Sequence, residues 1–344
     1  MTRGTDPLPT YRLDPTDAQA LAARALEASG ASAANAASTA HALVGAEIDG
    51  QTGHGLGRLP AYAAQLRAGK VDGQAVPTVV QARSASLWID AGGGFAYPAL
   101  DMAIDRIAAL IAETGIVAAG IRASHHVGQA GSTVERLADS GFVALLASNT
   151  PRAMAFHGGA KPMMGTNPVA FAAPIPGRPA LVIDLALSLV ARSKVVAAEK
   201  AGRRIPTDWA IDAAGAPTDD PAAALAGSLL PIGGAKGAAL ALMVEILCAA
   251  LVGARFGWEA SSFLDDRGDP PGVGQMLIAL DPNAFAGPAY GARMRDLLAT
   301  VGAEPGVRLP GDRRLERRAH ARTAGLEIPA DLHREIQRLA ERRA

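Results

Sequence analysis

The sequence predicts a protein of the α/β or α+β class, and three observations lead to this prediction. Strand-like and helical segments alternate through the middle of the chain, while helical patterns fill both ends. No G-x-G-x-x-G segment stands between a strand and a helix, since the three glycines at 92–94 are followed by Phe95 and Pro98. Any dinucleotide would therefore bind without the usual glycine fingerprint.

The first 70 residues are predicted to form a small helical unit. Residues 1–12 are polar and contain prolines, so we expect a loose tail there. Asp14 or Thr16 can cap a first helix with apolar residues at helical spacing, and Gly30 ends it. The expected helices cover about 14–29, 33–49 and 59–68.

The chain changes character after Lys70. Short apolar runs broken by turns predict strands, and longer periodic runs predict helices between them. Residues 202–230 are expected to form a loop with small turns, and the tail from Gly287 is expected to be helical again. The expected strands are 79–80, 87–90, 115–121, 141–147, a short strand after Pro168, 180–183 and 274–280; the expected helices are 98–113, 132–140, 189–200 and 235–252, the last being the clearest buried helix.

Composition limits the possible partners and the compartment. Lys plus Arg equals Asp plus Glu, 33 against 33, which argues against nucleic acid or a membrane surface held by bulk charge. The single cysteine, Cys248, lies in an apolar run and is predicted to be a buried hydrophobe. We find no signal segment and no confident membrane span, so we expect a cytoplasmic protein without disulfides.

Two residues of a glycine-rich turn can do chemistry. His54 lies between two glycines, and an imidazole titrates near neutral pH and can deliver a proton. Arg58 follows four residues later, where a guanidinium can hold a carboxylate through two parallel hydrogen bonds. The alternatives are a surface histidine and a solvated arginine at a helix start.

Other candidate groups have structural and functional interpretations side by side. His125 and His126 are expected to end a strand with their side chains on opposite faces, and no residue spacing predicts a metal site. Asp184 ends a buried strand, where it can either cap a helix or meet a ligand. The segment 233–237, GGAKG, can cap a helix or bind a phosphate.

Several motifs in the same order resemble the malate/L-lactate dehydrogenase family of the non-Rossmann type, also called the L-sulfolactate dehydrogenase-like family. The resemblance covers nearly the whole chain, and some stretches are similar to its Δ1-piperideine-2-carboxylate/Δ1-pyrroline-2-carboxylate reductase branch. The family motifs are Gly53-His54-Gly55 with Arg58, 124–128, 165–168, Asp184 with Ser188 and Lys194, Trp209-Ala210, 233–237 without Ala235, and 308–311; the branch stretches are 71–75, Asp90-Ala91, 93–96, 98–100 and 256–259.

The resemblance implies a largely antiparallel central sheet in a domain that binds NADPH or NADH, and a helical domain built from both chain ends. The implied division is 1–75 for the first part of the helical domain, 76–285 for the cofactor domain and 286–344 for the return to the helical domain. It also implies a homodimer that acts on a small-molecule acid.

The resemblance further implies roles for individual residues. His54 would donate the proton, Arg58 would hold the substrate carboxylate, and Asp184 would orient or polarise the histidine beside the nicotinamide. His126 would lie near substrate and cofactor. The remaining implied contacts are Thr166 and Asn167 for the substrate, and Ser148, Asn149, Thr166, Asp184, Ser188, Lys194, Gly233, Gly234, Lys236 and Gly237 for the cofactor.

The implied reaction is hydride transfer to C2 of an imino or oxo acid. We expect a reductase of cyclic imino acids; the alternatives are a 2-hydroxy acid dehydrogenase (malate, lactate or ureidoglycolate) and a dinucleotide-binding protein without catalysis. Four positions depart from the family pattern. Gly53 stands where a Ser is usual, Ala235 replaces His or Tyr, Leu187 replaces Thr, and Ser193 replaces Gly.

Overall fold

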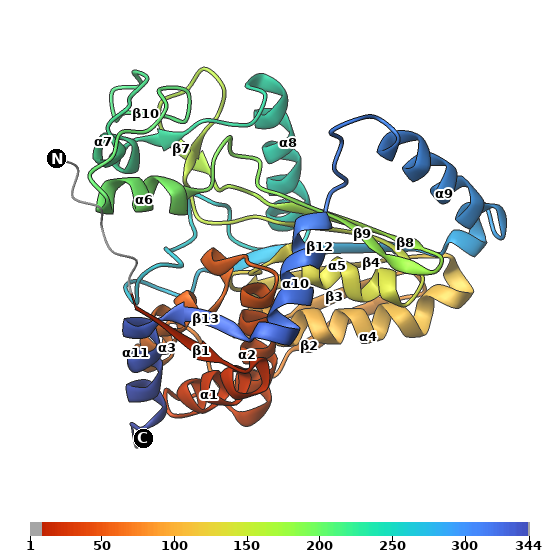
Figure 1. Ribbon diagram of the computed structural model, residues 1–344, viewed down its shortest axis with the longest axis horizontal. Coiled ribbons are helices and arrows are strands. Elements are labelled where there is room, and N and C mark those ends of the chain that lie inside the picture. The colour runs from red at the N-terminus through yellow and green to blue at the C-terminus, as the bar shows by residue number, and fades with distance from the viewer. Residues whose placement is uncertain (1–8, 343–344) are drawn as a thin grey trace.

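The computed structural model describes residues 9–342 and is built around a seven-stranded sheet (Figure 1). All neighbouring strands in it run antiparallel except β3 and β4, so the predicted, largely antiparallel sheet is confirmed. Across the sheet the order is β2 (Thr78–Arg83), β3 (Ser86–Asp90), β4 (Ile116–Ser124), β12 (Val273–Leu280), β5 (Val143–Ser148), β8 (Val169–Ile175) and β9 (Arg178–Leu185).

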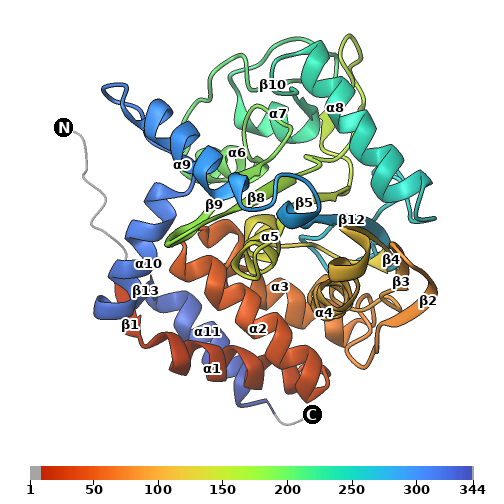
Figure 2. The same ribbon diagram turned by 90° about the vertical axis from the view of Figure 1, so that its right-hand side faces the viewer.

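Helices cover both faces of this sheet. Helices α4 (Ala96–Thr114) and α5 (Ala130–Asp139) lie along one face, where they enclose the largest apolar core (Figures 1 and 2). Helix α8 (Ala235–Glu245) and the π-helical turn η3 (Ile246–Ala250) cover part of the other face, and the buried Cys248 belongs to this second core. Central strands therefore read as continuous apolar runs because both of their faces are packed.

The two ends of the chain share a third core. It holds apolar residues of the first three helices together with residues from the last helices of the chain, and Figure 2 shows these elements side by side. We propose that this core defines the helical domain, with the division at 75 and 286 given above. Its helices are α1 (Pro15–Glu27), α2 (Ala33–Ile48), α3 (Leu59–Arg67), α10 (Asp312–Ala324) and α11 (Ala330–Ala340).

The expected loose tail is wrong for residues 10–12. Strand β1 (Thr10–Leu13) pairs antiparallel with β13 (Leu326–Pro329), which joins segments more than 300 residues apart. Neither partner predicts the pairing alone, because the hydrogen bonds form only once both ends of the chain have met. Residues 1–8 of the predicted tail lie outside the described residues.

A smaller unit packs beyond α8. Its four-stranded sheet has the order β10-β11-β6-β7, and two short helices accompany it. Residues 202–230, predicted as a loop, thus contribute a helix and two short strands. The elements are β6 (Met154–Ala155), β7 (Pro162–Met164), β10 (Ala210–Ile211), β11 (Ser228–Leu229), α6 (Arg192–Lys200) and α7 (Pro221–Ala226); η4 (Pro282–Ala284) and α9 (Ala289–Gly302) follow the main sheet.

The predicted buried helix 235–252 is corrected in two ways. Its α-helical part ends at Glu245 and continues as the π-helical turn. Much of its apolar surface is exposed, with Met243 at 55% and Ile246 at 52% of full accessibility. The helix lies on the sheet with one side only. Within residues 9–342, no helix is long and apolar enough to cross a membrane.

Candidate functional site

A double 3₁₀ turn between α2 and α3 presents His54. The first turn, η1, covers Thr52–His54 and the second, η2, covers Leu56–Arg58. The carboxylate of Glu47 accepts the backbone N–H of Leu56 at 2.9 Å, and a side chain on Gly55 would collide with that carboxylate. The glycine therefore allows α2 to hold the loop closely and to fix the imidazole in place.

His54 stacks on His126. The two ring centroids lie 5.2 Å apart, with 21° between the ring planes. Burial, and then the positive charge of Arg58, lower the pKa of His54 to about 4. Its Nδ1 atom is buried and has no hydrogen-bond partner within the described part of the chain. At neutral pH the imidazole is therefore uncharged and can act as a proton acceptor.

His125 and His126 follow strand β4 in a loop. Both rings are buried and both pack against Tyr62 and Phe263, so the expectation that they occupy opposite faces is wrong. The loop turns the chain after Ser124, and the alternation of a strand no longer applies. Burial lowers the pKa of His125 to about 3 and the pKa of His126 well below its usual value, and Arg58 adds to both effects.

Helix α3 and the turn that follows it hold the segment that covers these rings. The buried ammonium of Lys70 donates to three backbone carbonyls, of Ser262, Asp265 and Arg267, at 2.7 to 2.9 Å. The side chain of Gln65 donates to the carbonyl of Phe263 at 3.0 Å. These bonds fix Phe263 over the two histidines, where it excludes water from one side of the site.

Arg58 supplies the positive charge near the histidines. Its Nε donates to the carbonyl of Gly53 at 2.7 Å, and its side chain is half-buried. No ion pair of this guanidinium is found among the described residues. A cation without a counter-ion beside a neutral imidazole suits an acidic ligand.

Asp184 lies near the end of β9, beside the start of α5. Its Oδ2 accepts the backbone N–H of Gly131 at 2.8 Å. Burial raises the pKa of the carboxyl, although the residue as a whole keeps an exposed surface. Among residues 9–342 Asp184 makes no hydrogen bond to His54, so its role of orienting or polarising the histidine stays a prediction.

The two predicted substrate ligands after Gly165 differ in their surroundings. Thr166 is half-buried, and its carbonyl accepts the N–H of Leu187 at 2.8 Å. Asn167 is fully buried, and its amide donates at 3.0 Å both to the carbonyl of Ala241 and to the carboxylate of Glu245. Both amide donors of Asn167 are thus occupied by the protein, so Asn167 positions the turn and does not donate to a ligand.

Ser148 and Asn149, predicted cofactor contacts, are also directed into the protein. The Asn149 amide donates to Glu245 at 3.2 Å and to the carbonyl of Arg255 at 2.8 Å. The hydroxyl of Ser148 contacts the carbonyls of Asn149 and Gly274. Glu245, whose pKa is raised by burial, thereby joins the strand ends to α8. These residues support the site from beneath.

Comparison with known proteins gives the same family as the motifs. The sequence profile of the malate/L-lactate dehydrogenase family matches residues 13–337. The chain belongs to this family. It is an NAD(P)-dependent oxidoreductase. It is 48% identical to a (2R)-3-sulfolactate dehydrogenase (NADP(+)) of Chromohalobacter salexigens, with 94% of this chain and 96% of the relative covered. It is 39% identical to a Δ1-pyrroline-2-carboxylate/Δ1-piperideine-2-carboxylate reductase of Pseudomonas putida, with 95% of each chain covered.

A solved structure agrees with this assignment. The Δ1-piperideine-2-carboxylate reductase of Pseudomonas syringae pvar. tomato superposes with a TM-score of 0.91 at 36% identity. The match covers 96% of this chain and 100% of the solved one. The family fold therefore extends over nearly the whole chain.

The first turn of α8 fits a cofactor phosphate. Gly233 and Gly234 have φ angles of +60° and +61°, and a Cβ on Gly233 would meet no atom within 4 Å, so the backbone there is open to a ligand. No side chain caps the helix, which leaves its first N–H groups free, and Lys236 is exposed beside them. Gly237 packs against the carbonyl of Ile232, where a side chain would not fit.

Two further predicted cofactor contacts lie on the connection from β9 to α6. Ser188 is buried, and its hydroxyl donates to the carbonyl of Val190 at 2.8 Å. Lys194 is exposed in the first turn of α6. The Ser188 hydroxyl is thus occupied by the protein, whereas the exposed ammonium of Lys194 can reach a ligand phosphate.

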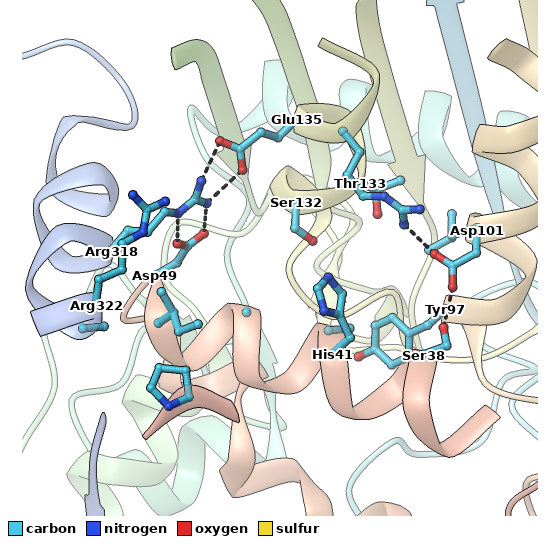
Figure 3. Close-up of a pocket in the computed structure, with 17 residues that line it drawn as sticks. Ser38, His41, Asp49, Tyr97, Asp101, Ser132, Thr133, Glu135, Arg318 and Arg322 are labelled. Atoms are coloured by element: carbon cyan, nitrogen blue, oxygen red, sulfur yellow. Dashed lines mark hydrogen bonds and ion pairs between the residues drawn. The ribbon is translucent and has the colours of Figure 1, made fainter. Parts of the chain in front are cut away.

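A cavity of about 360 Å³ lies behind the site, between α2, α4, α5 and α10. Figure 3 shows Arg318 between the carboxylates of Asp49 and Glu135 at its edge, and Asp101 on the opposite side. None of the predicted site residues lines this cavity. It is separate from the histidines that the sequence predicted.

Sequence reasoning missed several residues that build the site. Tyr62 and Phe263 pack on the histidines, and Glu245 anchors the two asparagines. Ser193 Oγ lies 3.7 Å from the point where a Cβ on Gly53 would sit. A charged residue inside an apolar helix was a usable signal for Glu245. The other three depend on contacts between distant segments.

Proposed function

We propose that this protein is an NADP(H)-dependent dehydrogenase of a small 2-hydroxy acid that has a second anionic group, with 3-sulfolactate as the leading substrate. The observation that supports this best is the neutral imidazole of His54 beside the cation of Arg58. The 48% identical relative named for 3-sulfolactate and NADP(+) favours this substrate and cofactor.

The proposed mechanism uses three side chains. Arg58 holds the C1 carboxylate and so fixes which face of C2 is presented. His54, neutral at pH 7, takes the proton from the C2 hydroxyl during oxidation and returns it during reduction. The nicotinamide supplies the hydride chemistry. Asp184, near the end of β9, is the proposed acid that would orient or polarise the imidazole when substrate and cofactor are bound.

The start of α6 supports a substrate with two anionic groups. Ser193 approaches Gly53, next to the proposed proton acceptor, and Arg192 and Lys194 flank this serine. Arg192 is half-buried, burial lowers its pKa, and its Nε has no hydrogen-bond partner among residues 9–342. A sulfonate or second carboxylate would supply that partner.

Cyclic imino acids are the second candidate. The 39% identical relative and the solved structure with a TM-score of 0.91 are both named as reductases of such acids. Segments 71–75 and 256–259 of this chain also resemble that branch. The same site would protonate an imine nitrogen in place of an oxygen, with Arg58 on the single carboxylate.

A substrate panel tests the proposal. NADP⁺ reduction is measured with 3-sulfolactate, malate and lactate, and NADPH oxidation with 3-sulfopyruvate and Δ1-piperideine-2-carboxylate. We expect the highest kcat/KM for the sulfonated pair. A higher value for the cyclic imine would replace the first candidate with the second. Arg192→Gln should raise KM for 3-sulfolactate and leave KM for lactate unchanged, because lactate has no second anion.

We also propose that the enzyme is a homodimer that buries the exposed apolar face of α8. Leu240 and Met243 of α8 form this face, and the exposed Ile246 of η3 and Leu251 just beyond η3 continue it. Light scattering after size exclusion should give the mass of a dimer, and Met243→Asp should give a monomer. Phe285→Asp, at another exposed apolar residue, is the control. A monomeric unsubstituted protein would contradict this assignment.

A further inference from the structure

Two tyrosines form a buried chain of hydroxyls that ends on His126. The hydroxyl of Tyr62 lies 2.7 Å from Nδ1 of His126, and the hydroxyl of Tyr97 lies 3.3 Å from that of Tyr62. Tyr62 is fully buried and Tyr97 is 7% exposed. Burial raises the pKa of both phenols, so each retains its proton at neutral pH.

The direction of the two hydrogen bonds follows from counting donors. If Nδ1 of His126 donated to Tyr62, Tyr62 would donate to Tyr97, and the Tyr97 proton would have no partner in the described part of the chain. If Tyr97 donates to Tyr62 and Tyr62 donates to Nδ1, every hydroxyl proton is used. In the second arrangement the remaining proton lies on Nε2 of His126, which, unlike both nitrogens of His125, is not a fully buried atom without a partner and can donate to solvent or a ligand. No tyrosine hydroxyl is then left as a donor without a partner, so the second arrangement is favoured.

We propose that Tyr97 and Tyr62 hold His126 in the neutral tautomer with its proton on Nε2, which makes His126 a fixed hydrogen-bond donor in the candidate site. Nε2 has no partner among the described residues, and the ring stacks on His54. Tyr62 and Tyr97 are thus positioning residues that act through His126. The functional part of this inference rests on the proposed dehydrogenase site.

The fixed tautomer gives the two stacked histidines different roles, proton transfer for His54 and hydrogen-bond donation for His126. His54 lacks a partner on Nδ1 and is free to gain and lose a proton. His126 has its Nδ1 occupied, so it can donate from Nε2 to an acceptor on the substrate or cofactor without changing charge. Such a donor stabilises negative charge that develops at C2 oxygen while His54 handles the proton.

Nitrogen NMR of the full-length protein with ¹⁵N-labelled histidine tests the tautomer directly. At pH 7 the His126 signals, assigned by comparison with His126→Gln, should show a protonated Nε2 and an unprotonated Nδ1. Tyr62→Phe should shift them toward a mixture of tautomers and lower kcat about 10-fold, the size expected when one hydrogen bond is lost, with KM unchanged. Tyr97→Phe should produce a smaller change of the same kind.

Tyr290→Phe is the matched control, because among residues 9–342 its hydroxyl bonds to the carbonyl of Pro174 and to neither histidine. It should alter neither the His126 signals nor kcat. A protonated Nδ1 in the unsubstituted protein would overturn the inference. So would Tyr62→Phe with the signals and kcat of the control. The tautomer is measured without substrate. The NMR result therefore stands even if the substrate panel rejects the proposed dehydrogenase activity.

Discussion

Two buried polar clusters join the helical unit to the sheet. One consists of paired charged groups, and the other consists of uncharged histidine rings beside an arginine. In the ion cluster of Asp49, Glu135, Arg314 and Arg318, each carboxylate and guanidinium is ion-paired, although the buried Nε of Arg314 has no partner in the described residues, and the Arg314 and Glu135 side chains are joined by bonds of 2.6 and 2.8 Å. In the histidine cluster of His54, His125 and His126, buried nitrogens lack partners in the described residues, as at both nitrogens of His125.

This difference separates stabilising residues from functional ones. Burial raises the pKa of Glu135, but hydrogen bonds from Arg318 and Arg314 outweigh it and hold the pKa below its usual value. The histidine cluster keeps uncharged rings beside an arginine with no counter-ion, which costs stability. Such an arrangement is expected where a ligand is to supply the missing partners.

Breaking the ion cluster should have the largest effect. Glu135→Ala removes one of the two carboxylates that Arg314 and Arg318 share, leaves Asp49 alone against both guanidinium groups, and should lower the free energy of unfolding by about 3–5 kcal/mol. Urea denaturation followed by circular dichroism measures it. Glu327→Ala, in an exposed pair with Arg12, is the control and should cost at most about 1 kcal/mol. Equal losses for the two variants would contradict the distinction.

Breaking the histidine cluster should affect turnover more than stability. His54→Ala should lower kcat by about 100-fold or more, because the proposed proton acceptor is lost. Steady-state kinetics with the best substrate of the panel measures this. His320→Ala, at an exposed histidine of α10, should retain full activity. Undiminished turnover of His54→Ala would remove His54 from this role.

Replacing Arg58, whose charge lowers the histidine pKa values, should weaken binding of the acid. Arg58→Gln should raise KM for the acid roughly 10- to 100-fold, as expected for loss of a charged hydrogen bond, with a smaller change in kcat. Arg58→Lys retains the charge but cannot form two parallel hydrogen bonds. Its KM should lie between the values for the unsubstituted enzyme and for Arg58→Gln. If KM stayed constant in both variants, the substrate carboxylate would have to bind elsewhere.

Acid should affect the histidine cluster before the ion cluster. The folded pKa values of His54 and His125, about 4 and about 3, lie below 6.5, so the unfolded chain binds more protons and stability falls as pH drops below 6.5. Glu135 contributes stability above its unfolded pKa of 4.5, and this is lost only at lower pH. Denaturation at pH 7.5, 6 and 5 should show the earlier loss, and His125→Gln should reduce it.

Local patterns in the sequence predicted much of the fold. The strand predicted at 274–280 is β12, an apolar run that is buried on both faces, and the strand predicted at 87–90 is β3, whose residues alternate between buried and partly exposed. The pairing of β1 with β13 could not be predicted, since it depends on residues at the two chain ends. Helix α8 appeared buried because its apolar residues occupy all sides, including the exposed one.

A family motif names His54 and Arg58, and their roles in the site stay predictions. The site was not predictable where a side chain has several possible partners. Asn167 and Asn149 were expected at the ligand, but the carboxylate of Glu245 takes their amide protons. The hydrogen-bonded tyrosines join α3, α4 and the loop after β4. No residue spacing in the sequence predicts that these three segments come into contact.

The most direct test is a crystal structure of the enzyme with NADP⁺ and a non-reacting analogue of its best substrate. We predict that the analogue carboxylate contacts Arg58, that its C2 oxygen lies within hydrogen-bond distance of His54, and that C2 is roughly 3–3.5 Å from the nicotinamide. An analogue or nicotinamide bound away from these side chains would contradict the proposed site.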